Sequence, residues 1–160
     1  IFGELFMLIE QDKRGNSLSL LYSDEKFSVP DNVYIIGMMN TADRSLAMLD
    51  YALRRRFAFY DMKPGFDTEG FCEYKDGLHS EKFNKLVSEI GRLNRAISED
   101  ESLGDGFCIG HSYFCEIDKV EVGTLEDIVQ YEIIPLIKEY WFDEQQKVKD
   151  WSDSLWRAIS

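Results

Sequence analysis

The sequence has no hydrophobic run long enough to cross a lipid bilayer. Its longest uninterrupted apolar stretches, residues 6–9 and 33–36, fall far short of the roughly 20 residues that a membrane-spanning helix needs. The first residues carry no basic region ahead of an apolar stretch, which a signal peptide would have. We therefore expect a soluble, cytoplasmic protein without membrane contact.

Cysteine is also scarce, and its distribution excludes two ways of stabilising a domain. Cys72, Cys108 and Cys115 are odd in number and lack CxxC spacing or an HxxxH partner motif. Neither a disulfide framework nor a zinc site follows from such a set. We expect reduced, buried thiols and no metal ligands.

Positive charge is in short supply as well. The 160 residues hold 18 Lys and Arg against 30 Asp and Glu, a net charge of −12. Such a surface repels nucleic acid, because non-specific binding depends on basic side chains displacing phosphate counterions. We expect DNA to be bound elsewhere in a longer protein, and the start at Ile1 without an initiator methionine predicts that this chain is a fragment.

The apolar residues that are present suffice for one core or for two small cores, since 44% of the chain is hydrophobic. Up to Pro64-Gly65 their pattern predicts an α/β arrangement. The continuous apolar run over 33–39 is typical of a strand buried on both faces of a parallel sheet. The other predicted elements are a helix over 1–10, hairpin strands over 19–22 and 27–29, a helix over 44–55 and a strand over 57–60.

Beyond residue 65 the pattern becomes helical. Ser80 can cap a helix to about residue 100, and a glycine-containing loop over 101–110 follows it. A last helix is expected over 144–159. The core stripe of the first of these helices is predicted to be Phe83, Leu86, Ile90, Leu93 and Ile97.

A further helix is predicted to begin at Thr124, whose Thr-Leu-Glu-Asp sequence resembles a capping box. Its predicted core stripe is Ile128, Tyr131, Ile134 and Ile137. Pro135 lies inside this pattern and predicts a kink or a break, because proline lacks the backbone N–H that a helix uses.

Polar residues follow the predicted parallel strand, at the edge where open α/β sheets build ligand sites. Asn40 offers both a donor and an acceptor, so it could hold an attacking water or polarise a terminal phosphate. The alternative interpretation is that Asn40 and Asp43 only cap the next helix, where these residue types are common.

Three consecutive arginines, Arg54-Arg55-Arg56, end the predicted helix over 44–55. One interpretation is structural: they balance the negative helix end and pair with nearby carboxylates. The other is an arginine finger, a cation supplied to a neighbouring subunit's nucleotide to stabilise the transferring phosphoryl group.

These motifs resemble those of the McrB-type AAA+ GTPases, the GTPase subunits of McrBC modification-dependent restriction systems. The resemblance covers most of the chain. It is carried by Asn40-Thr41-Ala42-Asp43-Arg44-Ser45-Leu46-Ala47, Asp50-Tyr51-Ala52-Leu53-Arg54-Arg55-Arg56-Phe57, Gly106-Phe107-Cys108-Ile109-Gly110-His111-Ser112-Tyr113-Phe114 and Glu139-Tyr140-Trp141-Phe142-Asp143, with Pro64-Gly65-Phe66-Asp67-Thr68 and Phe2-Gly3-Glu4-Leu5 in support.

The resemblance implies a fold in two parts. Residues 1–64 would be the C-terminal portion of an AAA+ α/β core, and residues 65–160 a helical lid. It also implies a GTP- and Mg²⁺-dependent motor that assembles as a hexameric ring and works with an McrC-like endonuclease subunit. Another domain of the family reads 5-methylcytosine in DNA.

The resemblance also implies roles for single residues. Asn40 matches the sensor-1 asparagine, and Asp43 completes its motif. Arg55 and Arg56 match the positions expected to act across a subunit interface. Nucleotide contacts are implied for Thr41, Arg44, His111 and Ser112; for His111, the alternative is a buried histidine whose nitrogen is satisfied by the backbone.

The sequence contains no Gly-x-x-x-x-Gly-Lys-Ser/Thr motif, and residues 8–12 do not form the strand that a Walker B carboxylate pair requires. We therefore expect this chain to bind no cofactor and to hydrolyse no nucleotide by itself. Two alternatives stay open: a fragment of an ATP-dependent remodelling ATPase of the MoxR or midasin kind, and a non-catalytic assembly module derived from an AAA+ protein.

Overall fold

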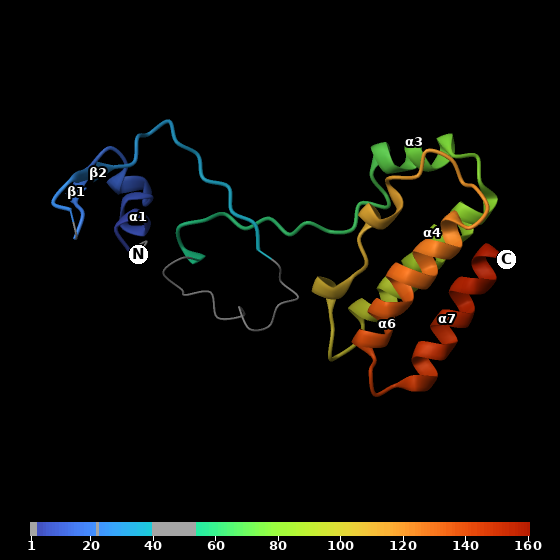
Figure 1. The fold of residues 1–160 in the computed structure, drawn as a ribbon. Coiled ribbons are helices and arrows are strands. Elements are labelled where there is room, and N and C mark those ends of the chain that lie inside the picture. Colours follow the sequence, from blue (N-terminus) through green and yellow to red (C-terminus); the bar gives the residue numbers. More distant parts are fainter. Residues whose placement is uncertain (1–2, 22, 40–53) are drawn as a thin grey trace. The chain divides into compact units, whose positions relative to one another are not determined.

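The computed structural model describes residues 3–21, 23–39 and 54–160 (Figure 1). The chain divides into two compact units, Ile1–Asp61 and Met62–Ser160. Each unit has its own cluster of buried side chains. The two units are therefore described one at a time.

The first unit begins as predicted with a short helix and a hairpin. Helix α1 spans Gly3–Leu8, the 3-10 turn η1 spans Gln11–Lys13, and strands β1 (Ser17–Ser19) and β2 (Lys26–Ser28) pair antiparallel. The hairpin lies one to three residues earlier than expected. Its apolar side chains cover a small core of Leu8, Ile9 and Val29.

The parallel sheet that we expected is not found among the described residues, whose only sheet is the β1-β2 pair. Residues 33–39 form no strand, and the side chains of Ile36 and Met38 are 92% and 97% exposed. Residues 57–60 form none either. A strand buried on both faces needs flanking strands to satisfy its backbone groups, and the described residues provide none. The predicted helix over 44–55 lies outside the described residues except for its last two positions.

The second unit is helical throughout (Figure 1). Ser80 caps the long helix as predicted, because its hydroxyl accepts a hydrogen bond from the Phe83 N–H. A helix that we did not predict precedes it and is capped in the same way by Thr68. The elements are α3 (Glu69–Gly77), α4 (Glu81–Ser98), the 3-10 turns η3 (Asp105–Phe107) and η4 (His111–Phe114), α5 (Thr124–Asp127), the π-helix η5 (Ile128–Ile133), α6 (Ile134–Tyr140) and α7 (Gln145–Ile159).

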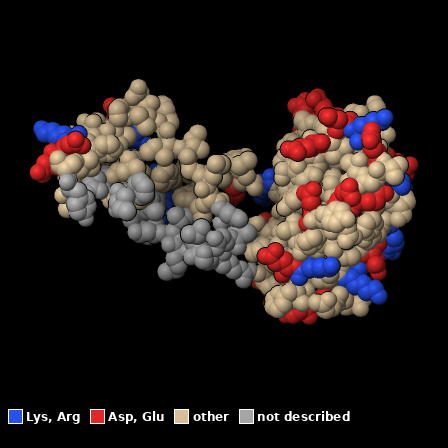
Figure 2. Space-filling view, in the orientation of Figure 1, with Lys and Arg blue, Asp and Glu red and all other residues tan. Residues whose placement is uncertain are grey.

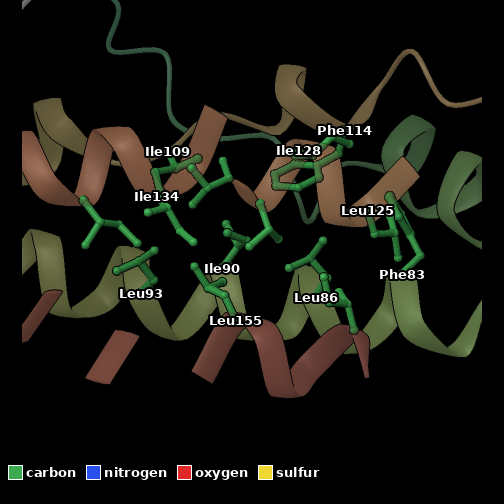
Figure 3. Packing of buried hydrophobic residues seen from close by; sticks show 14 of the residues in the cluster. Phe83, Leu86, Ile90, Leu93, Ile109, Phe114, Leu125, Ile128, Ile134 and Leu155 are labelled. Atoms are coloured by element: carbon green, nitrogen blue, oxygen red, sulfur yellow. The ribbon is translucent and has the colours of Figure 1, made fainter. Parts of the chain in front are cut away.

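The core of the helical unit lies where α4 packs against α7 and against the opposite helix formed by η5 and α6. Leu86, Ile90 and Leu93 of α4 point toward that helix (Figure 3). All five residues of the predicted α4 stripe are fully buried. Each such side chain contributes about 1.5–3 kcal/mol by leaving water. Among the described residues, no helix is long and apolar enough to cross a membrane.

The helix around Pro135 continues without a break, so of the two predicted outcomes, a kink or a break, the break is wrong. The π-turn η5 ends two residues before the proline, and the Ile134 N–H donates to the Val129 carbonyl, five residues back. Proline has no backbone N–H and cannot donate a hydrogen bond to a carbonyl of the preceding turn. A π-turn rearranges the hydrogen bonds of these carbonyls. Thr124 does not cap this helix, since Gly123 occupies that position with φ of 94° and Thr124 is the first helical residue.

Candidate functional site

Four of the predicted site residues, Asn40, Thr41, Asp43 and Arg44, lie outside the described residues. Their sensor-1 and nucleotide-binding roles therefore stay predictions. The described candidates are the arginine run of the first unit and the His111-Ser112 pair of the helical unit.

Arg55 and Arg56 meet at one carboxylate, that of Glu10. The Arg55 Nη2 lies 3.1 Å from the Glu10 Oε1, and the Arg56 Nη2 pairs with the same oxygen. The two arginines differ in exposure, with side chains 61% and 10% exposed. Glu10 carries one negative charge and cannot neutralise both guanidinium groups. The exposed Arg55 pair is weak, as surface ion pairs are, so Arg55 is the one that can leave Glu10 for another anion.

The pairing agrees with the structural interpretation of the arginine run and does not exclude the functional one for Arg55. The Arg54 guanidinium lies over the Phe59 ring, 5.8 Å from the ring centroid. Sequence reasoning missed Glu10, which lies 45 residues from Arg55. The available signal in the sequence was a carboxylate that directly follows an apolar helical stretch.

His111 accepts a backbone hydrogen bond, as the alternative interpretation predicted. Its Nδ1 lies 2.9 Å from the Gly65 nitrogen. The ring is half-buried and stands edge-on to Phe66 and Phe71, with centroid distances of 6.2 and 5.8 Å. An Nδ1 that accepts a hydrogen bond is unprotonated, so the neutral ring carries its proton on Nε2. His111 is thus already used within the helical unit.

Ser112 is exposed and lies at the edge of an open hollow of about 380 Å³. Two glutamates, Glu116 and Glu132, line this hollow together with Tyr113, Thr124 and Ile128. Their carboxylates would repel a phosphate group. A nucleotide contact of Ser112 through this hollow would therefore involve the uncharged part of a nucleotide. Among the described residues, no three His, Cys, Asp or Glu side chains converge as metal ligands would.

Asp100 is the centre of a polar cluster that sequence reasoning missed. Its Oδ2 accepts from the Trp141 Nε1 at 2.8 Å and from the Lys147 Nζ at 2.6 Å, and its Oδ1 accepts from the Ser102 N–H and hydroxyl. The Lys147 ammonium and these hydrogen bonds hold the pKa of the Asp100 carboxyl well below its usual range. The cluster ties the ends of α4 and α6 to the start of α7. We assign it a structural role.

The cysteines are free thiols, as expected, but they are not all buried. Cys115 is exposed, whereas Cys72 and Cys108 are half-buried. Burial raises the pKa of the Cys108 thiol, which donates to the Asn94 carbonyl. A thiol held protonated in this way is a poor nucleophile.

Comparison with known proteins identifies the helical unit. Residues 85–149 match the family model described as "McrB, alpha-helical lid domain". The "Type IV methyl-directed restriction enzyme EcoKMcrB subunit" of Escherichia coli K12 is 48% identical over 169 residues, which cover 97% of this chain and 36% of that relative. This chain is part of an McrB-type protein. The "Type II restriction enzyme BsuMI component YdiS" of Bacillus subtilis is 27% identical over 128 residues, 67% of this chain and 37% of that relative.

The match to the lid family includes one pair of the described candidate residues and leaves out the other. His111 and Ser112 lie within the matched McrB lid, whereas Arg55 and Arg56 precede it. The chain spans little more than a third of the length of either relative. The helical lid that the resemblance implied is thus confirmed, and the α/β core is not seen among the described residues.

Proposed function

We propose that this chain is the lid-bearing part of a GTP-hydrolysing AAA+ motor subunit in a modification-dependent restriction system. The observation that carries the proposal is the 48% identity, over 97% of the chain, to a subunit named as a methyl-directed restriction enzyme. A second relative is also named as a restriction enzyme component. In this proposal the cognate modification is 5-methylcytosine, read by a part of the protein outside this chain.

The described residues do not fit a bound GTP·Mg²⁺ by themselves. They offer no glycine-rich phosphate loop, and the hollow beside Ser112 is lined by carboxylates. The phosphates and the metal would be held by residues outside this chain. Within the chain, Asn40 and Asp43 would serve their own subunit's site, with Thr41 and Arg44 beside them.

Arg55 is the residue that we propose to reach a neighbouring subunit's nucleotide. Its exposure and its weak pair with Glu10 allow it to exchange one anion for another. Arg56, with a side chain only 10% exposed, would hold Glu10 and the local backbone in place. The proposed assembly is a ring of identical subunits that works with an McrC-like endonuclease.

The negative charge of the lid agrees with the proposal that other parts of the protein bind DNA. Residues 62–160 hold 21 Asp and Glu against 11 Lys and Arg, so the helical unit carries −10 of the net charge of −12. Acidic side chains are spread over the visible face of this unit (Figure 2). A surface of this sign repels the DNA backbone.

The test is nucleotide hydrolysis by the full-length parent protein with GTP and ATP side by side. We expect Arg55→Ala to lower GTP turnover by about a thousandfold, the typical worth of an arginine finger, with GTP binding retained. Arg55→Lys is the matched control that keeps the charge but loses the planar fork, and it should rescue turnover only in part. Arg56→Ala should instead lower the thermal stability.

The alternatives predict other results. Normal turnover in Arg55→Ala would make the arginine run structural. A preference for ATP would favour the MoxR or midasin kind of remodelling ATPase. No hydrolysis of either nucleotide by the assembled parent would favour a non-catalytic assembly module.

A further inference from the structure

Burial of the chain at the start of the helical unit begins abruptly at Gly65. Among the described residues, 58–63 lie outside every helix and strand, and all six are exposed. Pro64 is half-buried and Gly65 is buried. The connecting chain therefore changes from fully exposed to buried within two residues.

Both backbone polar groups of Gly65, the N–H and the carbonyl, form hydrogen bonds. Its N–H donates to the His111 Nδ1 at 2.9 Å, across 46 residues of sequence. Its carbonyl accepts from the Thr68 hydroxyl at 2.7 Å and from the Thr68 N–H at 3.2 Å. A buried backbone N–H needs such a partner, and here a side chain of η4 supplies it.

The fit between Gly65 and the His111 ring is close. A Cβ built on Gly65 would lie 3.1 Å from the His111 Cε1 and 3.3 Å from the Nε2. The ring cannot withdraw freely, because Phe66 and Phe71 stand against it at nearly right angles. His111 thus holds Gly65 by a directional bond and by contact.

We propose that His111 is a positioning residue that fixes the backbone of Gly65, the point where the connecting chain joins the lid. A motor uses a lid only if its motion is transmitted through that junction. The functional part of this inference rests on the function proposed above, whereas its structural part does not.

The structural test is amide hydrogen exchange of the 160-residue chain, followed residue by residue by NMR. His111→Phe keeps a ring but removes the acceptor, and His111→Asn keeps an acceptor near the position of Nδ1. We expect the Gly65 amide to exchange about tenfold faster in His111→Phe and to keep most of its protection in His111→Asn. The exposed His79→Asn is the control and should change nothing; its φ of 48° suits asparagine.

The functional test uses the full-length parent. His111→Phe should lower kcat severalfold and leave KM for the nucleotide unchanged, and His111→Asn should restore kcat. A Gly65 amide that exchanges as fast as residues 58–63 in the unmodified chain would overturn the proposal, as would unchanged protection in His111→Phe. Altered exchange with an unaltered kcat would overturn the functional part. A parent that hydrolyses no nucleotide would refute the proposed function and leave the exchange result to decide the structural part.

Discussion

At the scale of single residues, Asp100 shows how one carboxylate can join three helices. Its side chain is 10% exposed and accepts from Trp141 and Lys147. The folded state lowers the pKa of this carboxyl below its ordinary value of 3.8. The stabilisation is therefore complete above about pH 4 and is lost as the pH falls further, because the unfolded chain then binds the proton first.

We expect Asp100→Asn to lower the free energy of unfolding by about 1.5–3 kcal/mol at pH 7, the range for hydrogen bonds to charged groups. Urea unfolding between pH 7 and pH 2 should show the difference from the unmodified chain shrinking below about pH 4. The exposed Asp153→Asn should stay within about 0.5 kcal/mol. A difference that does not depend on pH would contradict the assignment.

The sequence could not have revealed this cluster, nor the Glu10 pair. Lys147 lies 47 residues from Asp100 and Arg55 lies 45 residues from Glu10. Charged residues at such separations have no spacing rule, since only the fold brings them together. His111 is different, because its residue type alone suggested two possible roles: contact with a nucleotide, or a hydrogen bond to the backbone.

At the scale of elements, the helix of residues 124–140 shows where a regular period misleads. A 3.6-residue repeat placed Tyr131 on the core stripe, but its side chain is 72% exposed. The buried pairs are Ile128-Val129 and Ile133-Ile134, five residues apart. That spacing fits the i→i+5 turn of a π-helix and not an α-helix. The α4 stripe was predictable because no such turn interrupts it.

This interpretation predicts that the π-turn contains one residue more than an α-helix would need. Deletion of the exposed Gln130, combined with Pro135→Ala, should give an uninterrupted α-helix and change the free energy of unfolding by no more than about 1 kcal/mol, the size of a propensity effect. Deletion of the exposed Lys85 in α4 is the control. It rotates all later residues by about 100° and should prevent folding, because Ile90, Leu93 and Ile97 leave the core.

Circular dichroism and urea unfolding distinguish the two deletions. If both deletions unfold the chain, the π-turn is required by packing that the burial pattern does not reveal. If both are tolerated, the α4 stripe contributes less than its full burial indicates.

At the scale of the whole molecule, the predictability of each unit follows from where its partners lie. The helical unit buries its apolar faces against its own helices, so local periodicity was enough to predict most of it. The apolar pattern over 33–39 is typical of a central strand, but a central strand forms only between two neighbouring strands. The described residues contain no strands that pair with 33–39, and the pattern of one segment does not show whether such strands are present.

The same contrast predicts that residues 62–160 fold alone. Nineteen side chains form the buried cluster of that unit, against three among the described residues of the first unit. A core of nineteen side chains is typical of an independent domain. All three tryptophans, Trp141, Trp151 and Trp156, belong to it, so their fluorescence reports its unfolding only. We expect the fragment and the whole chain to share one urea midpoint by this signal.

Self-association should differ between the whole chain and the fragment of residues 62–160. Tyr34, Ile36 and Met38 are exposed in the first unit, and an exposed apolar segment with unpaired backbone groups favours self-association. Sedimentation should therefore show dimers or larger species of the whole chain and a monomer of residues 62–160. The substitutions Ile36→Lys and Met38→Lys, which place charge in the exposed segment, should reduce the association without moving the tryptophan midpoint. A midpoint that falls when residues 1–61 are removed would mean that the lid depends on the first unit for its stability.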